Sequence, residues 1–335
     1  MSISLRPRPR MLHIAKRQSG IALIIVLWIM TLLMLIASSF IQSMRTEINI
    51  VGNSVTRAKL EAVANAGVQR AILEMVKPPQ MTDRWNVYGV PQEWNFQGQT
   101  VKVSMLDESG KIDINVGNEG LLRGLFRSQG LSEEEAAALM DAILDWRDLD
   151  TIKRLHGAEE EEYKAAGLTY KPANAAFQSI EELRLVLGMT PALFQRIAPL
   201  ITIYSRQPGI NSQIASREVL RAIPGVLEEQ IDEYIKQREL ARASKLPVPA
   251  FGPAALLPSF GNGVMNVRVE ASSEDGTTFV REAVVLRLPF PKRSYTFLRW
   301  QEGAPLDNSI IPSTAIPPAT ASGIGKVAVN DGKSR

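Results

Sequence analysis

Residues 16–44 read KRQSGIALIIVLWIMTLLMLIASSFIQSM, and the stretch from Ile21 to Met44 contains no charged residue. A bilayer core about 30 Å thick needs about 20 apolar residues in a helix, so this stretch is long enough to cross it. The first twenty positions contain five basic residues and no acidic one. Because cationic flanks stay in the cytoplasm, we expect the N-terminus there and the chain after Ile41 on the other side.

Three interpretations of this segment compete. An ordinary secretory signal would be cut before Phe40, but its apolar core would exceed the usual ~7–15 residues. A plain single-span anchor is the simplest alternative. The residues favour the third interpretation, a leader that is cut after Gly20. Basic residues, a glycine and then an uninterrupted apolar helix are typical of a type IV prepilin cleavage site, and a glycine lets a peptidase approach the backbone closely.

The helical pattern continues beyond Met44. Apolar residues recur at three-, four- and seven-residue steps as far as Val76, with charged residues on the other faces. Pro78-Pro79 ends this pattern, because proline lacks an amide hydrogen and disfavours helix before it. A helix over 21–77 would be about 85 Å long. We expect its first half to face lipid or neighbouring subunits and its second half to pack on a globular domain.

Strand-like alternation of apolar and polar residues appears in three later stretches, namely 99–106, 264–272 and 277–288. Asp275-Gly276 lies between the last two and predicts a tight hairpin, because that turn needs positive φ. A further strand is expected over 295–300. The aromatic segment 80–99 is expected to be a loop.

The residues between these strands indicate helices instead. Ser132 with Glu135 forms a capping signal, and Pro191 after Thr190 marks another helix start. The expected fold is therefore α+β, with an all-α domain inserted into a small antiparallel sheet. The expected parts are a leader (1–20), a membrane-spanning and amphipathic helix (21–77), a sheet domain (78–110 and 247–301), the inserted helical domain (111–246) and a disordered tail (302–335).

Composition excludes several classes of chemistry. The 335 residues include no cysteine and two histidines, His13 and His156, so disulfides and cysteine-ligated metals are absent. The net charge falls from +3 to −2 once the five cations of the first twenty residues are removed. The folded part is thus slightly acidic, which does not favour nucleic acid as a partner.

An acidic cluster is the main candidate site. Asp145 and Asp148 are three residues apart on one helix face, Asp150 follows, and Glu159 comes after a short loop. These oxygens suit a hard cation such as calcium, which takes six to eight ligands in irregular geometry. A solvated acidic surface explains the same residues.

Five stretches together resemble the K-type minor pseudopilins of bacterial type II secretion, over roughly Gln18–Trp300. They are GIAL at 20–23 with VLW at 26–28, DESGKIDIN at 107–115, AILDWRD at 142–148, GAE at 157–159 and SIEELR at 179–184. The resemblance implies a pilin-like fold, cleavage after Gly20 by the prepilin peptidase, and N-methylation of Ile21. It also implies calcium binding in the helical domain, at Asp145, Asp148, Asp150 and Glu159.

The resemblance further implies a place at the tip of a periplasmic pseudopilus that exports folded proteins. The implied partners are the I- and J-type minor pseudopilins, the major pseudopilin, the inner-membrane secretion platform and secreted substrates. Most pilin-like subunits have glutamate at the fifth position after cleavage, where this chain has Ile25. A terminal subunit does not need that carboxylate, which is costly inside a bilayer.

Other functions remain as alternatives. A minor pilin of a type IV pilus and a plain membrane-anchored periplasmic binding protein share the N-terminal features. Pro224-Gly225 resembles the turn of a DNA-binding helical hairpin, but Glu228 and Glu229 follow it and would repel phosphate. Because no substrate-cleft signature accompanies the carboxylates, we expect no enzymatic activity. The expected location is the bacterial inner membrane, crossed once, with the C-terminal domain in the periplasm.

Overall fold

The computed structural model describes residues 19–78, 81, 83–257, 263–290 and 293–305. Most of the leader expected over 1–20 and of the tail expected over 302–335 lies outside these residues. The chain divides into two compact units, Met1–Lys59 and Leu60–Arg335. The helix expected over 21–77 is therefore shared between them.

Helix α1 extends from Ser19 to Val76 as one 58-residue helix. Its apolar segment begins at Ile21 and is long and apolar enough to cross a membrane. Side chains in this segment are exposed, including that of Ile25. The long helix of the expected α+β fold is thus confirmed, and it is a candidate membrane anchor.

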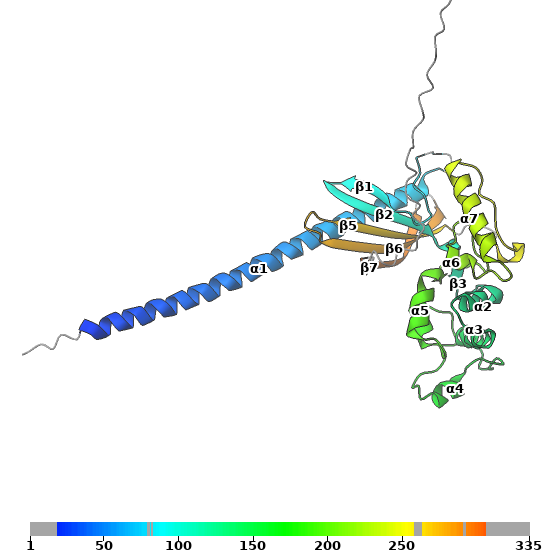
Figure 1. Cartoon of the computed structure of the whole chain (residues 1–335), viewed down its shortest axis with the longest axis horizontal. Helices are drawn as coiled ribbons and strands as arrows, with labels where there is room; N and C mark the ends of the chain where they lie inside the picture. Colours follow the sequence, from blue (N-terminus) through cyan, green and yellow to red (C-terminus); the bar gives the residue numbers. More distant parts are fainter. Residues whose placement is uncertain (1–18, 79–80, 82, 258–262, 291–292, 306–335) are drawn as a thin grey trace, which may run out of the picture. The chain divides into compact units, whose positions relative to one another are not determined.

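Five antiparallel strands form the sheet in the order β1-β2-β5-β6-β7. Figure 1 shows these strands beside the second half of α1. Residues 273–277 join β5 and β6 and include Gly276 with φ of +86°, so the hairpin that Asp-Gly predicts is present, but its turn is longer than the two-residue type. The strand bounds are β1 Gln92–Phe96, β2 Gln99–Asp107, β5 Val264–Ser272, β6 Thr278–Phe290 and β7 Arg293–Gly303.

Strand β1 corrects the expectation of a loop over 80–99. It pairs with β2 through a two-residue turn at Gln97 and Gly98, whose φ values are +50° and +77°. Trp94 and Phe96 stack on one face of the strand with ring centroids 4.8 Å apart. Two-residue turns with positive φ at both positions match the twist of a hairpin and usually contain Asn-Gly or Asp-Gly. Glutamine takes the first position here, so the sequence does not show the usual hairpin signal.

The second half of α1 packs on one face of the sheet. Its residues from Leu60 to Met75 share one buried cluster with apolar side chains of β2, β5 and β6. Close approach depends on Gly67, since a Cβ there would lie 2.5 Å from Val269 Cγ1. The buried carboxylate of Glu74 is paired with Arg70 and Lys77, at 2.8 and 2.9 Å. Burial of this face stabilises the helix beyond its intrinsic propensity.

The inserted region is mainly helical, and the helices α2 to α7 lie together in Figure 1. Capping occurs where the sequence indicates it: Glu135 N donates to Ser132 Oγ, and Leu193 N to Thr190 Oγ1, both at 3.2 Å. The helix bounds are α2 Glu119–Ser128, α3 Glu133–Arg147, α4 Glu160–Ala165, α5 Pro191–Ile197, α6 Arg217–Leu220 and α7 Glu228–Ala243.

A short parallel ladder shows that this region is not entirely helical. Strand β3 (Ile112–Asp113) pairs with β4 (Ile201–Thr202), and both strands are buried. Two-residue strands are too short to show a period of two, so sequence patterning cannot detect them. The ladder closes around Asp113, whose carboxylate accepts the backbone N–H of Asn115 at 2.8 Å and of Arg206 at 2.7 Å.

Candidate functional site

The acidic cluster begins at the end of α3, which positions Asp145 inside the helical domain. Its side chain is fully buried. The helix continues for two further residues, and the chain then returns so that Arg154 N donates to Asp145 Oδ2 at 3.2 Å. The guanidinium of Arg154 adds a second contact, with Nε 3.4 Å from Asp145 Oδ1. Asp145 therefore holds the loop that follows its own helix.

Two other carboxylates lie in the same cluster and are incompletely paired. Asp148 Oδ2 is 3.5 Å from Arg154 Nη2. Among the described residues, Asp148 Oδ1 and Glu159 Oε1 are buried without a hydrogen-bond partner. Glu159 as a whole is only 8% exposed. Buried oxygens of this kind are costly unless something else satisfies them.

The electrostatics of the cluster agree with this geometry. Burial raises the pKa of Asp145, Asp148 and Glu159 above the ordinary carboxyl range. Neighbouring carboxylates raise these pKa values further: Asp148 acts on Asp145, and Asp150 acts on both Asp148 and Glu159. The local charge is therefore too negative for the single guanidinium that reaches it.

Asp150 has a different role from the other three residues. Its Oδ1 accepts the backbone N–H of Ile152 at 2.8 Å, and its carbonyl accepts Asn174 Nδ2 at 2.6 Å. Its side chain is exposed and shapes the loop. Across the described part of the chain, no three His, Cys, Asp or Glu side chains are gathered closely enough to hold a metal ion.

Gly157 is the residue that lets the loop pass the buried carboxylate. A Cβ at this position would lie 1.9 Å from Asp145 Oδ2 and 2.7 Å from Asp145 Cγ. Only glycine fits there without moving Asp145. The GAE segment therefore brings Glu159 toward the DWRD segment, so that the charges of Asp145 and Asp148 act on it.

Sequence reasoning missed Arg154, which provides the positive charge of the cluster. It also missed the exposed aliphatic side chains of the same loop. Leu149, Ile152 and Leu155 are 88%, 76% and 85% exposed, respectively. The only sign of this role in the sequence is that a basic residue lies between the DWRD and GAE segments. Its contact with Asp145 depends on the path of the loop, which the sequence does not show.

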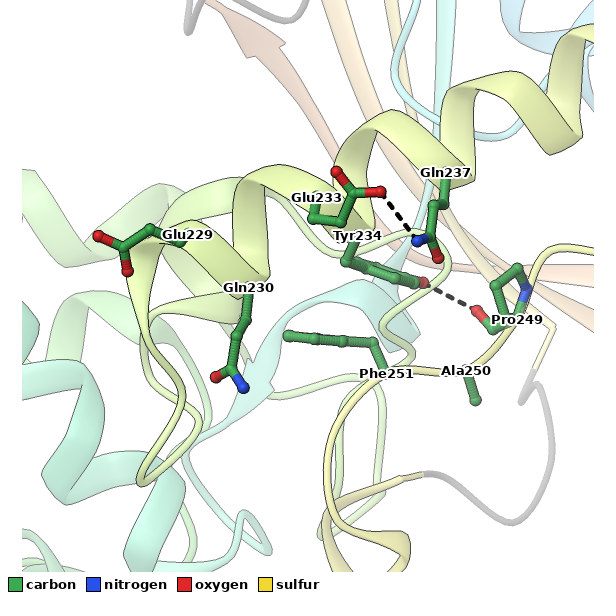
Figure 2. A pocket seen from close by; sticks show the side chains of 8 residues that line it. All are labelled: Glu229, Gln230, Glu233, Tyr234, Gln237, Pro249, Ala250 and Phe251. Carbon is green, nitrogen blue, oxygen red and sulfur yellow. Dashed lines mark hydrogen bonds between the residues drawn. The ribbon is translucent and has the colours of Figure 1, made fainter.

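A separate pocket of about 440 Å³ lies between α7 and residues 249–251. Tyr234 and Phe251 stack there with centroids 4.5 Å apart, and Tyr234 Oη donates to the carbonyl of Pro249 at 3.0 Å. Figure 2 shows that the polar side chains of α7 point in different directions and do not converge on one point. This pocket is therefore weaker than the acidic cluster as a site for a specific ligand.

Comparisons with known proteins agree on one family. Residues 103–206 match the family described as Type II secretion system (T2SS), protein K. Type II secretion system protein K of Klebsiella pneumoniae is 27% identical over 205 residues, which cover 55% of this chain and 62% of that protein. The Pseudomonas aeruginosa protein of the same name is 26% identical over 245 residues, covering 64% and 72%.

The Aeromonas hydrophila protein of that name is 28% identical over 212 residues, covering 56% of this chain and 63% of the relative. The alignments thus span about three fifths of the first relatives' lengths. One chain in the crystal structure of the GspK-GspI-GspJ complex from the enterotoxigenic Escherichia coli type 2 secretion system has the same fold. That match has a TM-score of 0.53 and 16% identity, and covers 78% of this chain and 99% of that chain.

The matched domain at 103–206 contains DESGKIDIN, DWRD, GAE and SIEELR, which belong to four of the five stretches on which the sequence resemblance depends. The curated relatives have one name in common, and the fold has the expected long helix and small sheet. Residues 103–206 of this chain thus match the type II secretion system protein K family, and the named relatives support a protein of that kind.

Proposed function

We propose that this protein is a minor pseudopilin at the tip of a type II secretion pseudopilus. It would help to initiate and cap the filament that moves folded proteins across the outer membrane. The observation that supports this proposal best is the architecture of α1. Its first part is exposed and apolar, and its second part packs on the five-stranded sheet, from whose strand β2 the protein K segment leads into the helical domain.

The proposed partners follow from the same family. The related crystal structure is a complex of GspK with GspI and GspJ. We infer that I- and J-type minor pseudopilins bind this chain, with the major pseudopilin below them. The bulk of the inserted helical domain would clash with neighbouring subunits inside a narrow filament, which fits a terminal position. Ile25, exposed and uncharged, fits a subunit that pairs with no further amine.

Deletion of the gene in its host tests this role. We expect exported proteins to accumulate in the periplasm and to disappear from the medium, and the intact gene to restore export. Twitching and surface pili should be unchanged. Normal export together with lost pili would contradict the proposal and favour the alternative of a type IV minor pilin.

Maturation is proposed to follow the prepilin route. The peptidase would cut after Gly20 and leave an N-methylated Ile21 at the start of the mature chain. The apolar helix that follows would remain in the inner membrane, with the sheet and helical domains in the periplasm. Basic residues before the helix support this orientation.

Calcium is proposed as the ion of the acidic cluster. Asp145, Asp148 and Glu159, with Asp150 nearby, would have to close around it, because no three acidic side chains of the described residues lie close enough to hold a metal ion. The buried, unpaired oxygens of Asp148 and Glu159 fit a hard cation, and so does the mutual repulsion of these carboxylates. Bound there, calcium would supply the positive charge that the cluster needs and would stabilise the α3–α4 connection.

A further inference from the structure

The pocket beside α7 combines negative charge with an aromatic surface (Figure 2). Of the described residues that line it, Glu229 and Glu233 are acidic and none is basic. Both side chains are exposed, and we call them the pocket carboxylates. Tyr234 and Phe251 stack in the same pocket, and Phe251 is half-buried. This lining suits a cation that is carried on an aliphatic stem, because such a stem packs on aromatic rings while its charge stays in water.

The pocket carboxylates differ from the other acids at the start of α7. Glu228 pairs with Arg217 and Arg221, each at 2.7 Å, and Asp232 also pairs with Arg217. Within the described residues neither pocket carboxylate has an ion pair, although Gln237 Nε2 donates to one of them at 3.0 Å. Like charges four residues apart on a helix repel each other. A cationic ligand would remove that repulsion.

The spacing of the pocket carboxylates suits an extended peptide. Four residues of α-helix rise about 6 Å along the axis. Alternate side chains of an extended chain lie on one side of it, about 6.6 Å apart. A segment with Lys or Arg at two alternate positions therefore sets one cation beside each carboxylate. Polar side chains that are spread along a helix, and do not converge on one point, fit such a segment better than a small molecule.

This chain contains a segment of that kind after its last described residue. Residues 306–335 include three basic residues, and two of them, Lys333 and Arg335, occupy alternate positions. The connecting residues 306–332 are long enough to extend over about 90 Å. A globular unit of about 250 residues has a radius of gyration of only about 18 Å. Because the pocket belongs to the same compact unit as the last described residue, the segment can reach it.

We propose that the pocket beside α7 is the docking site of residues 333–335 of this chain. Lys333 and Arg335 each pair with one pocket carboxylate, and their aliphatic stems lie on the aromatic surface. Tethering raises the effective concentration of the segment, so contacts that are individually weak act together. Docking holds residues 306–335 on the helical domain. This inference does not depend on the proposed role in secretion.

Chemical crosslinking of the full chain tests this inference, because the sequence contains no cysteine of its own. Ala250→Cys places a thiol in the pocket, and Ser334→Cys places one between the two cations. A short bismaleimide, added to dilute protein in detergent, should join this pair within one chain. Ala243→Cys with Ser334→Cys is the matched control, because Ala243 is exposed at the end of α7 and outside the pocket. The control pair should crosslink about fivefold more slowly or less.

Charge reversal separates docking from chance encounters. Lys333→Glu with Arg335→Glu should slow crosslinking of the pocket pair by about five- to tenfold, because two exposed ion pairs are lost. Glu229→Lys with Glu233→Lys should restore the rate in that background. All four positions are either exposed or outside the described residues, so thermal melts should match that of the parent chain.

Three results would overturn the proposal. The first is an equal crosslinking rate for the pocket pair and the control pair. The second is a rate that charge reversal leaves unchanged or that the complementary reversal does not restore. The third is a crosslinked dimer in place of a crosslinked monomer, which would assign the pocket to a second copy of the chain.

Discussion

The guanidinium of Arg281 in β6 lies 2.6 Å from the carboxylate of Glu61 in α1, and its Nε donates to Asn65 Oδ1 at 2.9 Å. The arginine is almost fully buried, and its charge also lies over the ring of Trp300, 5.1 Å from the centroid. Because the Arg281 guanidinium contacts residues of α1 and a ring of the sheet, it fixes the position of α1 along the sheet. This link between residues 220 positions apart joins the first and last parts of the globular unit.

Replacing Arg281 should destabilise this unit strongly. We expect Arg281→Met to lower the free energy of unfolding by about 2–4 kcal/mol, because buried charged hydrogen bonds and a cation–π contact are lost together. Glu61 is half exposed. Glu61→Gln should therefore cost less than about 1 kcal/mol. Urea denaturation of the full chain measures both, and equal small losses would show that Arg281 does not fix the helix.

Gly124 gives a prediction about the helical domain. A Cβ at this position would lie 2.0 Å from the carbonyl oxygen of Ala222, which is backbone and cannot rotate away. Gly124→Ala should therefore force α2 away from its neighbour and cost about 1–3 kcal/mol or more. Gly52→Ala is the control, since nothing lies within 4 Å there. The prediction fails if both variants melt at or above the wild-type temperature.

Two carboxyl groups should give stability changes of opposite sign with pH. Burial raises the pKa of Asp107, whereas hydrogen bonds from Ser132 lower the pKa of Glu135. The stabilising contribution of Asp107 is thus present at low pH and is lost as pH rises through its folded pKa. That of Glu135 is present at neutral pH and is lost as pH falls through its folded pKa.

Neutral variants of these two groups make that difference measurable. At pH 7 we expect Asp107→Asn to melt at or above the wild-type temperature and Glu135→Gln to melt below it. Both differences should shrink as pH falls toward 3. Thermal melts from pH 3 to 8 in a chelator check this. If the melting temperatures of both variants change with pH in the same way, the surroundings of Asp107 and Glu135 do not shift stability in opposite directions.

Ile25→Glu tests the meaning of an uncharged residue at the fifth position of the mature helix. A carboxylate in the bilayer costs about 2.5–3.5 kcal/mol unless it finds a partner. We expect the variant to crosslink to major pseudopilin subunits below the tip and to reduce export. Ile25→Leu should leave both unchanged. Unaltered export and an unaltered crosslink pattern for Ile25→Glu would count against a terminal position.

Much of the fold could be predicted because its long elements have strong periodicity. The helix expected over 21–77 extends from Ser19 to Val76, and the strand expected over 264–272 has those bounds. The missed elements are short. Strand β1 is five residues long and half exposed, and β3 and β4 have two residues each. Such elements are stabilised by tertiary pairing, and local sequence patterns give little sign of them.

The candidate site was predictable only in part, for a similar reason. Asp145, Asp148 and Glu159 belong to segments with recognisable spacing, and the structure brings them near enough for their charges to interact, but not near enough for three of the described acidic side chains to hold a metal ion. Asp150 lies nearby, but its carboxylate supports the loop backbone. The contact between Arg154 and Asp145 depends on the path of the loop around Gly157. No sequence period encodes such a path.

The N-terminal sequence and mass of the protein extracted from membranes, with prepilin peptidase present, test the pseudopilin assignment most directly. A pseudopilin gives a mature chain that starts at N-methylated Ile21, and Gly20→Leu should keep the leader attached. A wild-type chain that starts at Met1 would indicate a plain anchor. A chain that starts at Phe40 would indicate a released secretory protein, and either result would contradict the assignment.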